Sequence, residues 1–301
     1  MRAFKKTLLI GSGAALVSLL VATAVGAVFC NFSLHVFRRD PGHMPAELYP
    51  GGDWRTVSMR ASDGAALQAW FVTPRDKPRG RCVAVLHGIA DSRIGAVGFA
   101  PMFLDDGYSV LLPDSRGHGL SGGEFVTYGL MEKRDVLNWV HRMRDEGCTA
   151  IYGLGESLGG SLLIQASALE PVFRAIVAEC PFADLEAAAE VRVRRLLPLP
   201  NWFSETASRV IVTSGMLYAK ERFGLDFARV TPVNAMRQTK TPVLLIHGLE
   251  DDRTPFGHSQ QLARANAAAA LWLVPHAAHV HASSADPGGF RRRVLDWFAR
   301  H

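Results

Sequence analysis

The sequence predicts an α/β protein in which a mostly parallel central sheet is flanked by helices, with a helical cap insertion. Three observations support this prediction. Six short, continuous apolar runs are separated mostly by segments of helical length. Strands that are apolar on both faces and joined by helical crossovers indicate a parallel sheet buried between helices. The gap of about 60 residues between Cys180 and Pro242 is too long for a simple crossover, which predicts the cap insertion. A turn that contains a serine joins one of the apolar runs to a predicted helix.

The first predicted elements form a hairpin. Segments Arg55–Arg60 and Ala66–Val72 alternate across Asp63-Gly64, which is typical of two antiparallel strands. The predicted strands that follow are Arg81–His87, Tyr108–Pro113, Thr149–Leu154, Arg174–Cys180, Pro242–His247 and Leu271–Val274. We therefore expect one domain over residues 55–301, a polar linker at 31–54 and a cap insertion at about 182–235, which we expect to lie over a cleft.

Length and composition narrow the class of protein. With 301 residues, 48% of them hydrophobic, the chain can bury a large core, and it shows no internal repeat. The net charge is +5, but Arg2, Lys5 and Lys6 supply three of these charges. The triplet at 291–293 falls in a terminal helix candidate and is interpreted as a solvated face. These features predict that the protein does not bind nucleic acid.

The N-terminal region predicts a membrane element. Residues Thr7 to Cys30 form a run of 24 residues without a charge, which is long enough to cross the roughly 30 Å hydrocarbon core of a bilayer. The cations before this run favour a cytoplasmic N-terminus and an exported domain, although Arg38 and Arg39 oppose that orientation. We expect residues 1–30 to act as a single-pass anchor. A secretory signal cleaved after Ala22-Thr23-Ala24 is the alternative.

The cysteines do not suggest a metal site. Residues 30, 82, 148 and 180 show no C-x-x-C spacing, and three of them sit at the ends of predicted strands. This pattern favours buried free thiols. A bridge between Cys148 and Cys180 is the alternative if the domain lies in an oxidising compartment.

Ser157 is the candidate nucleophile. It lies in the G-x-S-x-G sequence of residues 155–159, between a predicted strand and a helix expected over Leu158–Leu169. Small residues at 155 and 159 let the backbone turn sharply, which exposes the serine hydroxyl. A serine hydroxyl is a weak nucleophile at neutral pH, so it requires a nearby base and a third group that orients the base.

Candidates for the acid and the base follow the last two predicted strands. Asp251 is the preferred acid and Asp252 the second candidate, because both lie in the loop after Pro242–His247. His279 is the preferred base, because it follows Leu271–Val274. The spacing of His276, His279 and His281 could suggest a metal site, but no cysteine or acidic cluster completes it nearby. We therefore expect no metal and no cofactor.

Two backbone amides are candidates for binding a developing negative charge on a substrate oxygen. One is the amide of Leu158, which follows the candidate nucleophile. The other is the amide of Ile89, in the loop that begins His87-Gly88 after an early strand. In this interpretation His87 supports the loop and is not the base.

Four motifs in order make the chain resemble the α/β-hydrolase superfamily of serine hydrolases over roughly residues 55–301. The order Ser157, Asp251, His279 matches the family order of nucleophile, acid and base, and His87-Gly88 resembles its oxyanion loop. The stretch at 114–121 resembles the turn after an early parallel strand, which implies a structural role for His118. The base loop departs from the family pattern, because Ala278 stands where many relatives carry glycine.

The resemblance implies cleavage of carboxylic esters, with a small or lipid-like ester as substrate. The same three residues would also serve a thioesterase or a serine peptidase of the aminopeptidase-like kind, so these activities are alternatives. A different possibility is a binding protein that retains the fold without turnover. Labelling by a fluorophosphonate probe distinguishes this possibility, because a pure binder needs no activated serine.

Overall fold

The computed structural model describes residues 20–76, 80–197 and 200–301. The chain forms two compact units. The first contains residues 20–34 and Leu185–Arg229, and the second contains His35–Asp184 and Val230–His301. The expected position of the cap insertion over a cleft stays a prediction.

The second unit is built on an eight-stranded sheet with the order β1-β2-β4-β3-β5-β6-β7-β8. The strands are β1 (Gly52–Arg60), β2 (Ala66–Pro74), β3 (Arg81–Leu86), β4 (Ser109–Pro113), β5 (Ala150–Glu156), β6 (Ile176–Glu179), β7 (Val243–Gly248) and β8 (Ala270–Val274). Strand β2 is antiparallel to both β1 and β4, and all other pairs are parallel. The predicted fold class, including the hairpin and the six later strands, is confirmed.

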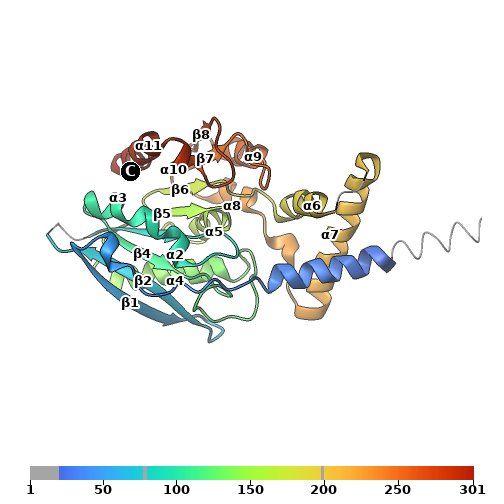
Figure 1. The fold of residues 1–301 in the computed structure, drawn as a ribbon, viewed down its shortest axis with the longest axis horizontal. Helices are drawn as coiled ribbons and strands as arrows, with labels where there is room; N and C mark the ends of the chain where they lie inside the picture. Colours follow the sequence, from blue (N-terminus) through green and yellow to red (C-terminus); the bar gives the residue numbers. More distant parts are fainter. Residues whose placement is uncertain (1–19, 77–79, 198–199) are drawn as a thin grey trace, which may run out of the picture. The chain divides into compact units, whose positions relative to one another are not determined.

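Helices lie on both faces of this sheet (Figure 1). The helical elements of the second unit are η1 (Ala46–Leu48), α2 (Arg93–Ala96), η2 (Val97–Phe99), α3 (Ala100–Asp105), α4 (Glu132–Asp145), α5 (Leu158–Ser167), α8 (Pro232–Gln238), α9 (Gly257–Ala265), α10 (Ala282–Ala285) and α11 (Pro287–Arg300). Helix α11 buries Phe290, Val294 and Phe298 and leaves residues 291–293 exposed. The arginine triplet therefore lies on a solvated helix face, as predicted.

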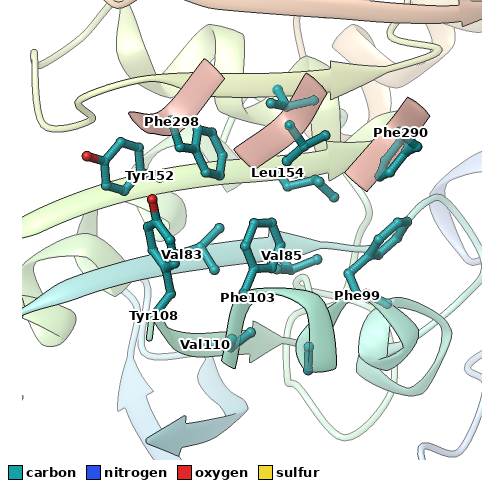
Figure 2. Packing of buried hydrophobic residues seen from close by; sticks show 14 of the residues in the cluster. Val83, Val85, Phe99, Phe103, Tyr108, Val110, Tyr152, Leu154, Phe290 and Phe298 are labelled. Atoms are coloured by element: carbon teal, nitrogen blue, oxygen red, sulfur yellow. The ribbon is translucent and has the colours of Figure 1, made fainter. Parts of the chain in front are cut away.

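Aromatic side chains dominate the core between the sheet and α3 and α11 (Figure 2). The ring of Phe298 lies 4.7 Å from that of Tyr152 and 5.8 Å from that of Phe103, measured between centroids. Tyr108 packs edge-on to Tyr152 at 5.5 Å. Such contacts add to the free energy gained by burial, so this core fixes the strands whose carboxyl ends carry the candidate site.

A disulfide joins Cys82 at the start of β3 to Cys148 just before β5. The prediction of free thiols is therefore wrong for these two residues, and the alternative bridge from Cys148 to Cys180 is wrong as well. Strands β5 and β6 are parallel neighbours. Cys148 lies at their amino ends, just before β5, whereas Cys180 lies at their carboxyl ends, just after β6, so the two thiols are too far apart to bond. Cys180 is a buried free thiol, as the pattern predicted, and Cys30 is also free.

The first unit consists of helices. Helix α6 (Leu185–Leu196), helix α7 (Asn201–Phe223) and η3 (Phe227–Arg229) accompany a helix over residues 20–34. Gly26 packs directly on α7, because a Cβ atom there would lie 2.5 Å from the carbonyl oxygen of Ile211. Of the predicted membrane segment, residues 7–19 lie outside the described residues. Within the described ranges, the structure contains no helix with both the length and the apolar character needed to span a bilayer.

Candidate active site

Ser157 occupies a sharp turn between β5 and α5, with a φ of 51° and a ψ of −111°. Two glycines make this turn possible. A Cβ atom on Gly155 would lie 2.4 Å from the carbonyl carbon of Gly159, and one on Gly159 would lie 2.4 Å from the Leu86 carbonyl oxygen. The Ser157 amide donates a hydrogen bond of 2.7 Å to the carbonyl of Glu179, which anchors the turn to the end of β6. A non-glycine residue held at positive φ is strained, and such strain is common at functional sites.

The predicted base and acid lie beside this serine. His279 Nε2 is 3.0 Å from Ser157 Oγ, and His279 Nδ1 is 2.7 Å from Asp251 Oδ2. If Nδ1 donates its proton to the carboxylate, Nε2 is free to accept the hydroxyl proton of the serine. Three residues that are far apart in the sequence thus form one continuous chain of hydrogen bonds.

Asp251 is held in one orientation by its own loop. Its Oδ1 accepts hydrogen bonds of 2.9 Å from the amides of Arg253 and Thr254. Its Oδ2 receives His279 and lies 3.1 Å from His247 Nε2. Burial favours a higher pKa for Asp251, but the hydrogen bonds from His247, His279 and Thr254 hold this pKa well below its usual range. The carboxylate is therefore ionised at neutral pH.

The second candidate acid, Asp252, is exposed, and it is the Asp251 carboxylate that contacts His279. His247 is a supporting residue that the sequence analysis did not identify. Its Nε2 is 2.6 Å from the Thr254 carbonyl and its Nδ1 is 2.7 Å from Ser259 Oγ, so these contacts connect the end of β7 to the acid loop and to α9. Its position four residues before Asp251, at the end of a strand, could have signalled this role.

The base loop after β8 passes very close to the end of β7. A Cβ atom on Gly248 would lie 2.2 Å from the Ala277 carbonyl oxygen, so only glycine allows this approach. Residues His276 and Val280 adopt positive φ values of 58° and 53° on either side of His279. The loop thus achieves its bend without the glycine that many relatives carry.

The two amides predicted to bind a developing oxyanion lie in segments next to Ser157. Leu158 is the first residue of α5, where backbone amides have no acceptor within the helix. The segment that contains Ile89 runs past the nucleophile, since a Cβ atom on Gly88 would lie 3.6 Å from that of Ser157. The adjacent Ala90 has a φ of 58° and donates its amide to His118 Nε2 at 3.1 Å.

Two neutral histidines support the segment that contains Ile89. His87 Nδ1 lies 2.7 Å from the Gly88 carbonyl and its Nε2 accepts the Ser115 amide at 3.0 Å. His118 Nδ1 lies 2.9 Å from the Arg116 carbonyl. Burial lowers the pKa of His87, and burial together with the His87 ring lowers the pKa of His118 to about 3. Both rings therefore act as neutral hydrogen-bonding supports.

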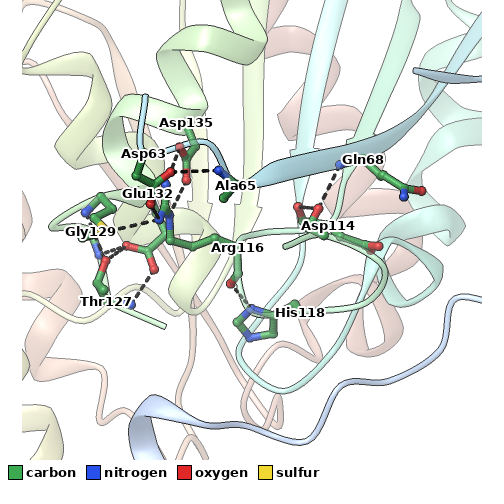
Figure 3. Close-up of polar contacts among 12 residues, drawn as sticks. Asp63, Ala65, Gln68, Asp114, Arg116, His118, Thr127, Gly129, Glu132 and Asp135 are labelled. Atoms are coloured by element: carbon green, nitrogen blue, oxygen red, sulfur yellow. Dashed lines mark hydrogen bonds and ion pairs between the residues drawn. The ribbon is translucent and has the colours of Figure 1, made fainter. Parts of the chain in front are cut away.

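A buried ionic network fixes the loop that carries His118 (Figure 3). Arg116 contacts Asp135 at 2.6 Å and Asp63 at 2.7 Å. Asp114 accepts the Arg93 amide and guanidinium at 2.7–3.0 Å, which ties the loop after β4 to the start of α2. Arg116, Asp135, Arg93 and Asp114 are buried, and buried charges are stable only when paired and hydrogen-bonded, so these pairs fix the loops after β3 and β4.

The described residues contain one group of three potential metal ligands, namely Cys180, Asp251 and His279, whose ligand atoms lie within 4.8 Å of one another. Asp251 and His279 are already bound to each other. Burial raises the pKa of the Cys180 thiol, which opposes the thiolate that a metal requires. His276 pairs with exposed Glu250 and His281 contacts the His279 carbonyl. We therefore assign Asp251 and His279 to the candidate triad, and Cys180 is a buried thiol beside them.

This fold and site define the chain as a member of the α/β-hydrolase superfamily. Residues 97–301, more than half of the chain, match the model of the prolyl oligopeptidase family, and the chain belongs to this family. Family and fold together identify it as a hydrolase.

The individual relatives share about a quarter of their residues with this chain. The chain is 25% identical to the uncharacterized protein YqkD of Bacillus subtilis, over 97% of each chain. It is also 25% identical to the acylamino-acid-releasing enzyme of Rattus norvegicus, over 84% of this chain and 36% of that enzyme. Among solved structures, the Pyrococcus furiosus esterase Pf2001 superposes with a TM-score of 0.71, at 23% identity, over 89% of this chain and 98% of the esterase. This last similarity concerns the fold.

Proposed function

We propose that the protein is a serine hydrolase that cleaves carboxylic esters through an acyl-enzyme intermediate. The observation that carries this proposal is the chain of hydrogen bonds from Ser157 Oγ through the His279 ring to Asp251. Ser157 Oγ attacks the ester carbonyl carbon while His279 Nε2 takes its proton. The substrate oxygen becomes negatively charged and accepts hydrogen bonds from the amides of Leu158 and Ile89.

The same groups complete acylation and then carry out deacylation. His279 gives its proton to the leaving alkoxide, and the acyl group stays on Ser157 Oγ. A water molecule then loses a proton to His279 and attacks the acyl carbon, and His279 returns this proton to Ser157 Oγ as the acyl–oxygen bond breaks, which releases the acid and restores the serine. The carboxylate of Asp251 stabilises the positive charge that His279 carries in both steps. Its depressed pKa supports this role, because the group stays ionised over the working range.

Peptide or thioester cleavage by the same residues is the alternative. The match to the prolyl oligopeptidase family and the similarity to the acylamino-acid-releasing enzyme favour a peptidase among these alternatives. Esters are the more reactive substrates, and the same triad would process them first. A binding protein without turnover is the less favoured proposal, because stability alone does not require these three side chains to meet.

Hydrolysis of two substrate series tests the proposal. The first is p-nitrophenyl esters with acyl chains from about two to sixteen carbons, and the second is N-acetylated amino-acid p-nitroanilides. We expect turnover of esters that Ser157→Ala abolishes. Faster turnover of the anilides would favour the peptidase. No turnover in either series, by a chain whose thermal unfolding is cooperative, would contradict a hydrolytic function.

We further propose that the N-terminal segment holds the protein at a membrane, with the hydrolase domain exported. Support comes from the uncharged run Thr7–Cys30, from the cations before it, and from the bond between Cys82 and Cys148, since disulfides persist in oxidising compartments. Retention in the membrane fraction at high salt, with the domain open to external protease, is the expected result. Release of a shortened soluble chain would instead indicate a cleaved signal.

A further inference from the structure

Glu179 contacts two of the segments that form the candidate site. Its backbone carbonyl accepts the amide of Ser157 at 2.7 Å, and its side-chain Oε1 accepts the amide of Ala282 at 2.9 Å. Ala282 follows His279 by three residues and begins α10. One residue at the end of β6 therefore binds the nucleophile turn through its backbone and the base loop through its side chain.

The neighbouring residue extends the same connection. Cys180 has a φ of 49°, donates its amide to the Ile246 carbonyl on β7, and accepts the Val280 amide on its Sγ at 3.4 Å. The chain just after His279 is thus attached to the end of β6 at two points, Val280 and Ala282. The carboxylate contact is the stronger kind, because an ionised acceptor binds an amide more tightly than a neutral sulfur does.

The Glu179 side chain is an unusual occupant of this position. It is 0% exposed, and its Oε2 has no hydrogen-bond partner among the described residues. Its register partners, Glu156 on β5 and Ile246 on β7, place it on the same face of the sheet as the apolar core. A buried carboxyl that is only half satisfied costs stability. An apolar side chain would serve the core better, so the carboxyl must be explained by what it contacts.

We propose that Glu179 is a positioning residue, which holds the loop of His279 against the end of β6 and so keeps the imidazole on Ser157. This inference rests on the proposed serine hydrolase function. The hydrogen bond to Ala282 fixes the far end of the base loop, while Gly248 fixes its near end at Ala277.

The hydrogen bond from Ala282 to Glu179 should depend on pH, because the Glu179 carboxyl changes its charge near neutral pH. Burial raises the pKa of Glu179 to about 7, and burial together with the charge of Glu179 raises the pKa of Glu156 to about 8. The titratable groups that act on Glu179 come from β5, β6, β7, the acid loop and the base loop; they are Glu156, Cys180, His247, Asp251 and His281. Glu179 is therefore mostly neutral at pH 6 and mostly ionised at pH 8.5. The hydrogen bond to Ala282 strengthens over this interval.

Glu179→Gln isolates the effect of ionisation, because the amide oxygen can still accept the Ala282 amide but carries no charge. We expect kcat on the best ester to be close to wild type at pH 6 and on the order of fivefold lower at pH 8.5. The ratio of the two enzymes at each pH removes the pH effects that both share. Glu170→Gln is the matched control, because Glu170 is exposed and lies outside the site; its ratio to wild type should stay near one at both pH values.

A second variant leaves Glu179 in place. Glu156→Gln removes a carboxyl whose pKa of about 8 lies above that of Glu179, so Glu156 is still mostly neutral while Glu179 ionises, and the rise in kcat should stay at the same pH. A Glu179→Gln ratio that does not change with pH would overturn the inference, as would loss of the rise in Glu156→Gln, since the rise would then belong to Glu156. Retention of activity by Ser157→Ala would instead refute the proposed function itself. Thermal unfolding of each variant identifies any loss that comes from misfolding.

Discussion

Replacing Asp251 by asparagine tests the assignment of the acid most sharply, because the loop fixes how the new amide must point. The amides of Arg253 and Thr254 both donate to Oδ1, so the asparagine oxygen must occupy that position. Its NH2 group then takes the place of Oδ2, which is 2.7 Å from His279 Nδ1. Two donors cannot face each other at this distance.

The ring of His279 relieves this conflict by moving its proton to Nε2. That nitrogen then presents a proton to Ser157 Oγ, 3.0 Å away, and can no longer accept one. Loss of the base in this way costs about four orders of magnitude in kcat in a serine triad. Asp252→Asn changes an exposed carboxyl, so we expect less than about a threefold effect.

The assay is kcat for the best p-nitrophenyl ester, measured on the detergent-solubilised full chain, with thermal unfolding of each variant as the control for folding. We expect Asp251→Asn to unfold cooperatively, at a temperature below that of the wild type because the stabilising carboxylate is lost, while its activity is almost lost. A severe effect of Asp252→Asn combined with a mild effect of Asp251→Asn would refute the reasoning about orientation.

Three further outcomes follow from contacts on either side of the site. Cys82→Ser should lower the free energy of unfolding by about 2–4 kcal/mol in urea titrations, and reductant should then have no additional effect; an equal response of both proteins to reductant would contradict a disulfide in the wild type. His118→Ala removes the acceptor of the Ala90 amide and should lower kcat about tenfold with little change in KM. An unchanged kcat would show that this histidine does not position the segment that contains Ile89. The folded-state pKa of Asp251 is depressed, so its stabilising contribution is present above the usual Asp value of 3.8 and is lost as the pH falls below it. The difference in unfolding free energy between wild type and Asp251→Asn should therefore shrink in acid, and a difference that stays constant down to about pH 2 would contradict this.

Strands that are buried on both faces are easy to predict, because each is a continuous apolar run between polar segments. Their ends are harder. Strand β5 continues beyond Leu154 to Glu156, since backbone pairing with β6 persists after the apolar run has ended. The meeting of Ser157, Asp251 and His279 was predictable, because parallel strands place their carboxyl ends at one edge of the sheet and each residue follows such an end.

The disulfide and the support behind the site depended on information that a linear pattern lacks. The bond between Cys82 and Cys148 depends on β3 lying next to β5, and no local pattern in the sequence shows this strand order. Glu179 gave the signal of a charged residue at the end of an apolar run, but its contact with Ala282 joins residues 103 positions apart. Such contacts become visible only when the loops are in place.

Reaction with a fluorophosphonate probe, followed by mass spectrometry of the labelled peptide, tests the central claim most directly. The hydrogen bonds to His279 and Asp251 predict one adduct, on Ser157, that is absent from Ser157→Ala and strongly reduced in His279→Ala. A folded wild-type chain that takes up no probe, or takes it up at another residue, would contradict the claim that this serine is an activated nucleophile.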